Sequence, residues 1–259
     1  MSIFQKLYNY RELLKTNVKK DIRGKYKRSF LGILWSFINP LLQVVVYAIV
    51  FPYLMGATTD NYLVYLITGL IPWSFFQMTV SAGTTTIKSN AGIIKKVYFP
   101  REILPLSQVL SGLVNFFISC IIILVFCLAF GVGISWHIIF VPFIAVIEAV
   151  LILGIVFILS SINVYIQDVE YIVQFILNML MYGTPIIYEL TKFSNAGVLY
   201  KFIYYNPMTQ LVFAYRACFV YHTIPSFKGL GAVSALAVVT LFVGYFIFCK
   251  LEKRFAEEL

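Results

Sequence analysis

The sequence predicts an all-α integral membrane protein with six transmembrane helices. Hydrophobic residues make up 61% of the chain, charged residues only 12%, and the mean hydropathy is +0.88. These values are typical of membrane proteins and far from those of soluble domains. A hydrocarbon core about 30 Å thick needs roughly 20 apolar residues per spanning helix. Six runs approach or reach that length, at residues 33–55, 62–87, 104–130, 137–160, 170–188 and 230–249.

The sequence outside these runs is too short for a second hydrophobic core. We therefore expect one transmembrane domain over residues 1–259. Within it, residues 1–30 are expected to form an amphipathic interface helix, residues 31–250 the six-span bundle, and residues 251–259 a cytoplasmic tail.

The basic residues predict the orientation of the chain. A net charge of +9 is compatible with nucleic-acid binding, but the basic residues gather on one side of the predicted spans, which argues against it. By the positive-inside rule both termini are cytoplasmic, as an even number of spans also requires. The residues on that side are Lys6, Arg11, Lys15, Lys19, Lys20, Arg23, Lys25, Lys27, Arg28, Lys88, Lys95, Lys96, Arg101, Lys250, Lys253 and Arg254.

The N-terminal segment has the pattern of an amphipathic helix at a membrane surface. Its apolar residues recur every three or four positions, and Lys and Arg dominate the other faces. Two readings remain open: the segment is a simple anchor, or its cations meet a phosphate-bearing substrate, because Arg and Lys bind phosphate oxygens. The apolar stripe is Ile3, Leu7, Tyr10, Leu14, Val18 and Ile22, and the densest cations are Arg23, Lys25, Lys27 and Arg28.

Prolines and aromatic residues gather in the first, second and fifth runs. Pro40, Pro72 and Pro185 each remove a helix hydrogen bond, so bends or breaks are expected there. Most aromatic side chains in such runs face lipid or interfaces. Trp73, however, lies near mid-bilayer, where an interfacial belt does not explain an indole N–H. The alternative is an aromatic channel lining for sugar rings, formed by Tyr47, Phe51, Trp73, Phe75, Phe76 and Tyr182.

The break between the second and third runs mixes charged and apolar side chains. A loop packed against the membrane is one interpretation. The other is a short surface helix that presents apolar residues to another protein and ends before Pro100.

Glu148 is an ionisable residue well inside a predicted span. Such a residue suggests a proton relay, but no Lys, Arg or His lies at similar depth, which favours a protonated or hydrogen-bonded structural glutamate. No Walker A loop, zinc-type histidine pair or nucleophile elbow is present. We therefore expect neither a catalytic nor a metal site in this chain, and a driving force supplied by another subunit.

Five segments resemble, in order, the conserved blocks of type 2 ABC exporter permeases. The first begins at Asp21 with DIRGKYKRSFLGILWSFINPLLQ. The others are GLIPWSFF (residues 69–76), SNAGIIKKVYFPREILP (89–105), TPIIY (184–188) and NPMTQLVFAYR (206–216). The resemblance covers essentially the whole chain, and the most similar group exports lipid-linked polysaccharides such as O-antigens, capsules and teichoic acids. Members of the family often carry Arg-Asp where this chain has Gln167-Asp168.

The resemblance implies a homodimer in the bacterial inner membrane with two copies of a separate subunit that binds ATP and Mg. It implies a channel lined by spans one, two and five, an N-terminal gate helix near the pyrophosphate of a lipid-linked glycan, and short re-entrant helices before the last span. It also implies a coupling helix that contacts the ATPase. That helix comprises Gly92, Ile93, Ile94, Lys95, Lys96, Val97, Tyr98 and Phe99.

Two other functions are weighed against glycan export. A type 2 exporter of small molecules would share the spans but need no channel for a hydrophilic chain. A membrane enzyme acting on lipid-linked sugars would need no ATPase, but it would need a catalytic constellation that the sequence lacks.

Overall fold

The computed structural model describes residues 10–26, 38, 41–47, 49–50, 61–97, 99–193 and 197–259. Across these ranges the chain is predominantly helical and contains no strand, which confirms the all-α prediction. The elements are α2 (Arg11–Tyr26), α4 (Tyr62–Ser89), α5 (Ala91–Ile94), α6 (Ile103–Ala129), η2 (Trp136–Phe140), α7 (Val141–Tyr165), α8 (Val169–Tyr182), η3 (Leu190–Phe193), α9 (Val198–Tyr205), α10 (Pro207–Phe219), α11 (Phe227–Leu251), η4 (Glu252–Arg254) and α12 (Phe255–Glu258).

Four of the predicted runs form helices long and apolar enough to cross a membrane. These are Tyr62–Ser89, Ile103–Ala129, Trp136–Tyr165 and Phe227–Arg254. Most of the first run lies outside the described residues, although residues 41–47 and 49–50 are helical.

The fifth run forms a shorter helix than the sequence predicts. Helix α8 has 14 residues, which at 1.5 Å per residue gives about 21 Å, less than the roughly 30 Å of a hydrocarbon core. The helix ends at Tyr182, and the chain continues without regular structure through Pro185. The break expected near Pro185 is therefore present. Pro72, in contrast, lies inside a continuous helix α4.

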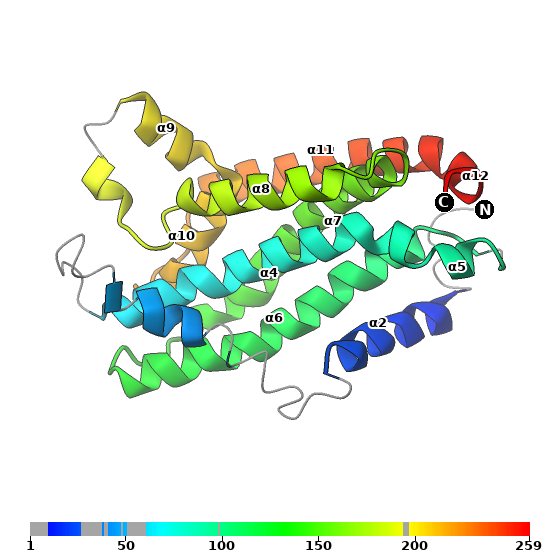
Figure 1. The fold of residues 1–259 in the computed structure, drawn as a ribbon. Helices are drawn as coiled ribbons and strands as arrows, with labels where there is room; N and C mark the ends of the chain where they lie inside the picture. Colours follow the sequence, from blue (N-terminus) through cyan, green and yellow to red (C-terminus); the bar gives the residue numbers. More distant parts are fainter. Residues whose placement is uncertain are drawn as a thin grey trace.

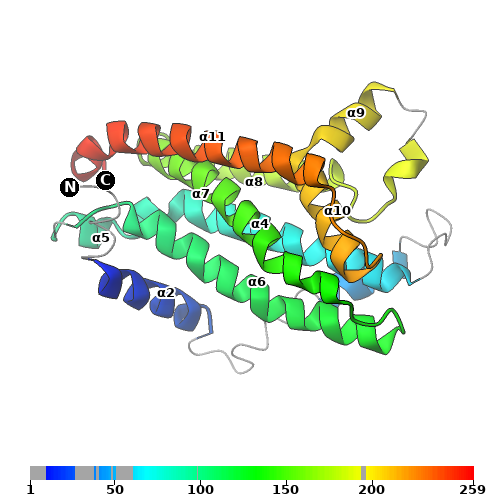
Figure 2. The ribbon, with the colours of Figure 1, turned by 180° about the vertical axis from the view of Figure 1, so that it is seen from behind.

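The long helices α4, α6, α7, α8 and α11 run side by side (Figures 1 and 2). Helices α5 and α12 lie at one end of this bundle, which we call the α12 end. Helices α9 and α10 lie at the opposite end, which we call the α10 end. Helix α2 packs along the outside of α6. The structure thus contains short helices before the last long one, where the resemblance implies re-entrant elements.

Helices α7 and α11 approach each other closely at two glycine residues, Gly154 and Gly244. A Cβ atom on Gly154 would lie 2.6 Å from the backbone nitrogen of Leu241, and one on Gly244 would lie 2.3 Å from the carbonyl oxygen of Gly154. Small residues of this kind allow helix backbones in membranes to approach closely. The two helices therefore form one tightly packed unit.

Candidate functional site

A row of polar side chains joins helices α4 and α8, and we call it the polar seam. Its members are Trp73, Gln77, Ser81 and Lys88 on α4 and Glu170, Gln174 and Asn178 on α8. In its middle, Gln77 Nε2 donates to Asn178 Oδ1 at 3.0 Å, and Ser81 Oγ donates to Gln174 Oε1 at 2.9 Å. These two hydrogen bonds connect residues about a hundred positions apart in the chain.

Two further contacts extend the seam. Towards the α10 end, the indole Nε1 of Trp73 donates to Gln77 Oε1 at 3.1 Å. Towards the α12 end, Lys88 Nζ lies 3.8 Å from Glu170 Oε2, and both side chains are partly buried. The indole N–H that the sequence left unexplained therefore has its partner one turn further along the same helix.

The spacing of the seam residues places them on one face of each helix. Residues four apart share a helix face, and Trp73, Gln77 and Ser81 follow that step on α4, as do Glu170 and Gln174 on α8. From Trp73 to Lys88 the helical rise is about 22 Å, most of a hydrocarbon core of about 30 Å. Polar residues at such depth usually face a protein interior or a water-filled path.

An open cleft of about 670 Å³ lies along the seam. Gln174 and Asn178 are exposed, so the seam faces outward from the single chain. The arrangement offers neutral amide and hydroxyl groups, with a charged pair at one end. The cleft is lined by Gln77, Met78, Ser81, Ala82, Thr85, Glu170, Tyr171 and Gln174.

The predicted aromatic lining divides into a first group buried in the core of the chain and a second group that lies beside the seam. Phe75 and Phe76 are 5% exposed and lie inside the chain's own core. The centres of the Phe75 ring and of the Phe116 ring on α6 are 5.2 Å apart. Trp73 is also buried, but its indole joins the seam. Tyr182 is 66% exposed at the end of α8.

Tyr47 belongs to the second group. It is half-buried, and its hydroxyl lies 4.0 Å from the sulfur of Met181, one residue before the end of α8. Phe51 lies outside the described residues. The structure thus brings Tyr47 and Tyr182 to the same end of α8, next to the seam.

Arg216 joins three segments at the α10 end. Its side chain is 1% exposed, and its Nη1 and Nη2 donate to the carbonyl oxygens of Pro185 and Ile186 at 2.7 and 2.8 Å. Nε and Nη2 also donate to the carbonyl oxygen of Tyr65, and the guanidinium carbon lies 3.4 Å from the centre of the Tyr65 ring. Arg216 thereby fixes the segment after α8 to the first turn of α4.

Asn206 makes a second connection there. Its Oδ1 caps α10 by accepting from the backbone N–H of Met208 at 3.0 Å, while Nδ2 donates to Gly183 O and Thr184 Oγ1, both at 3.1 Å. Pro207 follows as the first residue of α10, where its missing N–H is not needed. The Asn-Pro pair therefore starts α10 and holds the end of α8.

Glu148 has a hydrogen-bonding partner from a distant segment. It is fully buried on α7, and its Oε2 accepts from the hydroxyl of Tyr215 on α10 at 2.8 Å. No hydrogen-bond partner for Oε1 exists among the described residues. The hydrogen-bonded glutamate favoured by the sequence is present, and it ties α10 to the bundle.

The segment expected to couple to a partner exposes apolar side chains at the α12 end. Ile93 is 47% and Val97 58% exposed, whereas Ile94 and Phe99 point inward. Gly92, Lys95 and Lys96 are exposed as well, and Tyr98 lies outside the described residues. The regular helix covers only Ala91–Ile94, with turns at Lys95 and Lys96, so it is shorter than the expected one.

The inward residues of this segment rest on the C-terminal part of the chain. Ile94 and Phe99 belong to one buried cluster with Phe248 and Phe255. Arg101 donates a hydrogen bond to the carbonyl oxygen of Glu252 and lies over the Phe255 ring at 5.9 Å. The exposed surface of α5 is therefore mounted on a packed base.

The N-terminal helix α2 has the predicted amphipathic pattern over its described residues. Leu14 and Val18 are half-buried, while Lys15, Lys19 and Lys20 are exposed. The backbone of Arg23 and Lys25 is helical, and their side chains, together with Lys27 and Arg28, lie outside what the structure describes.

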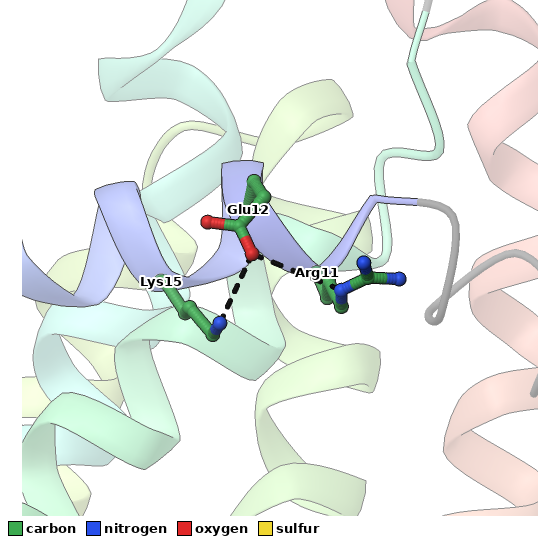
Figure 3. Close-up of polar contacts among 3 residues, drawn as sticks. All are labelled: Arg11, Glu12 and Lys15. Atoms are coloured by element: carbon green, nitrogen blue, oxygen red, sulfur yellow. Dashed lines mark hydrogen bonds and ion pairs between the residues drawn. The ribbon is translucent and has the colours of Figure 1, made fainter.

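Charged residues at the start of α2 form local ion pairs. Glu12 Oε1 lies 3.0 Å from Lys15 Nζ and 3.7 Å from Arg11 Nε. Figure 3 shows both contacts as dashed lines. The hydrogen bond from Lys15 lowers the pKa of the Glu12 carboxyl below its ordinary value. All three side chains are exposed, so these pairs contribute little to stability.

Among the described residues, four helices long and apolar enough to cross a membrane define a multi-pass membrane protein, and a row of polar side chains joins two of its helices. Residues 12–220 match the family model described as "ABC-2 type transporter". The chain belongs to this family.

Curated relatives match the chain over nearly its full length. It is 33% identical to the O-antigen export system permease protein RfbA of Myxococcus xanthus, over 99% of both chains. It is 34% identical to an O-antigen export system permease protein RfbA of Klebsiella pneumoniae, covering 96% of this chain and 95% of the relative. The polysialic acid transport protein KpsM of Escherichia coli is 21% identical over 87% of this chain and 88% of its own length.

Proposed function

We propose that the chain is the membrane-spanning permease subunit of an ATP-driven exporter that moves a lipid-linked polysaccharide or teichoic-acid-type polymer across the bacterial inner membrane. The polar seam is the observation that carries this proposal. A hydrophilic polymer needs hydrogen-bonding groups along most of the bilayer thickness. The seam supplies an indole, amides, a hydroxyl and a charged pair, spread over about 22 Å from Trp73 to Lys88. The full-length likeness to O-antigen export permeases supports the same substrate class.

The seam would line the channel of a homodimer. In one chain it opens to the outside through the 670 Å³ cleft, so a second copy facing it would enclose a polar path. Tyr47, Trp73 and Tyr182 lie beside the seam and would offer aromatic faces to sugar rings. Phe51 completes the proposed lining, whereas Phe75 and Phe76 pack in the core of the chain.

Energy would come from two copies of a separate ATPase subunit that binds ATP and Mg. The exposed side chains of Ile93 and Val97 fit a docking surface for that subunit, and the exposed Lys95 and Lys96 add charge to it. We take six spans from the six apolar runs and place both termini in the cytoplasm on the distribution of basic residues, an orientation in which α5 lies on the ATPase side.

The N-terminal helix would act as a gate for the pyrophosphate of the lipid carrier. Its exposed cations would meet anionic headgroups. Arg23, Lys25, Lys27 and Arg28 are the residues we assign to the pyrophosphate.

An export assay tests the seam. In cells that lack the chromosomal gene, Asn178→Leu is expected to reduce surface polymer by at least tenfold while the protein still reaches the membrane. Asn115→Leu is the matched control, since Asn115 is a half-buried asparagine on α6, away from the seam. Unchanged export with Asn178→Leu and Gln77→Leu combined would contradict a channel at this place.

A reconstituted complex tests the substrate. The chain and its ATPase partner are placed in lipid, and ATP hydrolysis is measured with and without an undecaprenyl-pyrophosphate glycan. We expect hydrolysis to rise with the glycan. Hydrolysis that ignores the glycan but responds to drugs would indicate a small-molecule exporter, and activity of the chain alone on lipid-linked sugars would indicate an enzyme.

A further inference from the structure

A second hollow is lined by residues from the start of α4, from α9 and α10, and from the segment leading into α11. Its volume is about 360 Å³, within the range of about 300 to 1,000 Å³ that is usual for small-ligand sites. It shares no lining residue with the cleft along the polar seam. The hollow is therefore a separate feature.

The floor of the hollow is rigid. Tyr65 and Arg216 lie there, 4% and 1% exposed, with the guanidinium stacked on the ring. The Tyr65 hydroxyl donates to the carbonyl oxygen of Tyr188 at 3.0 Å, and Arg216 donates to three main-chain carbonyl groups. Fixed walls lower the entropy cost of binding, because few groups remain to be ordered.

The rim offers aromatic and neutral polar groups. Tyr204 and Tyr221 line the hollow and are 39% and 56% exposed. Gln210, Thr223 and Ser226 lie beside them, and the described residues that line the hollow include no carboxylate. A pyranose ring has one apolar C–H face for a tyrosine ring and hydroxyl groups for amides and hydroxyls.

Other ligand classes fit the hollow less well. A phosphate needs several N–H donors, but Arg216 already directs four of its five at main-chain carbonyl oxygens. A hard metal ion needs carboxylate ligands, and none is found among the described residues that line the hollow. The lining also contains hydroxyl and amide groups, and a purely apolar ligand would leave these without hydrogen-bond partners.

We propose that this hollow binds one pyranose unit of the polymer as it leaves the polar seam, an assignment that rests on the proposed function. Arg216 links the floor of the hollow to Pro185 and Ile186, just after α8, so the hollow lies at the α10 end of the helices that carry the seam. A sugar held there retains the emerging chain while the ATPase resets.

Binding is tested on the intact complex of the chain with its ATPase partner in lipid nanodiscs. The probes are short oligosaccharides released by mild acid from the host's own surface polysaccharide, observed by saturation-transfer-difference NMR. We expect transfer to the ring C–H protons in the wild type. Removing one stacking ring with Tyr221→Ala is expected to weaken binding about threefold to tenfold, since such contacts contribute roughly 0.5–1.5 kcal/mol.

Two more variants make the test specific. Ala217→Phe fills the hollow from α10 and is expected to abolish binding. Trp136→Ala removes an aromatic ring that is 65% exposed on η2, an element that contacts α10, and is expected to change nothing. Basal ATP hydrolysis of each complex verifies that it is assembled.

The outcomes separate the two proposals. Transfer that survives Tyr221→Ala and Ala217→Phe but disappears with Asn178→Leu would place the sugar at the seam only and overturn the hollow. Absence of transfer to the wild-type complex in nanodiscs, when cells with the same chain export polymer, would also overturn the hollow while leaving the proposed function intact. The proposed function itself fails if cells without the chain still export.

Discussion

Replacing Arg216 by Met tests whether one buried guanidinium holds the α10 end together. Arg216 is the only hydrogen-bond donor to the carbonyl groups of Pro185 and Ile186 among the described residues, and both residues are buried. Leaving a buried acceptor unsatisfied costs about 1–3 kcal/mol, so two give about 2–6 kcal/mol. Burying the guanidinium carries a desolvation cost that the Met variant avoids. The expected loss of unfolding free energy is therefore about 2–4 kcal/mol.

The loss is measurable as a lower unfolding temperature. At roughly 2–4 °C per kcal/mol for a chain of this size, we expect a decrease of about 4–16 °C. Cys218 is fully buried on α10, so a thiol-reactive dye reports opening of that helix on heating. The other three cysteines are replaced beforehand.

Two further variants complete the experiment. Arg216→Lys keeps the charge, but one ammonium group cannot reach all three carbonyl groups, so an intermediate temperature is expected. Lys201→Met removes an exposed cation from neighbouring α9 and should leave the temperature unchanged. An Arg216→Met protein that unfolds within about 2 °C of the wild type, at 2–4 °C per kcal/mol, would refute the role assigned to these hydrogen bonds.

Three other predictions concern the packing, the seam and the partner surface. Gly154→Ala should destabilise the protein by about 1–3 kcal/mol by pushing α11 away, whereas Gly231→Ala, with open space around it, should be neutral or stabilising in thermal unfolding. Cysteines at Ser81 and Gln174, joined by a short thiol crosslinker, should stop polymer export until the link is cleaved; continued export would show that α4 and α8 need not separate. Ile93→Glu should prevent copurification of the ATPase subunit without lowering the unfolding temperature, and an intact complex would exclude this docking surface.

The spans were predictable because length and apolarity are local properties. The second, third and fourth runs begin and end within a few residues of α4, α6 and the η2–α7 pair. The length of the helix in the fifth run was predicted wrongly, for a reason that is not local. Its helix stops at Tyr182, and the residues after it are held by Arg216 and Asn206 from a later segment. Composition alone could not reveal that connection.

The candidate site was only partly predictable. Trp73 stood out because a mid-bilayer indole needs a partner, but the sequence directed attention to aromatic neighbours rather than to Gln77. The polar step of four in two apolar runs is visible in the sequence. That Gln77 meets Asn178 depends on the relative register of two helices far apart in the chain, which no local pattern determines.

The hydrogen-bond partner of Glu148 was also not predictable from the sequence. The sequence offered no charged residue at its depth, and its partner is a neutral phenol, Tyr215, on a helix expected at the exit. A search restricted to ionisable partners could not find it.

Helix α4 connects the hollow, the polar seam and α5. It runs without a break from Tyr65, in the floor of the hollow, to Ser89, one residue before α5 begins. Helix α8 is short, and its far end is fixed to α4 through Arg216. A push on α5 therefore acts on one continuous rod, with its tightest attachment at the opposite end. Among the polar contacts of the seam, the Lys88–Glu170 ion pair lies nearest to α5, so such a push loads this pair first and then the hydrogen bonds of Ser81 and Gln77.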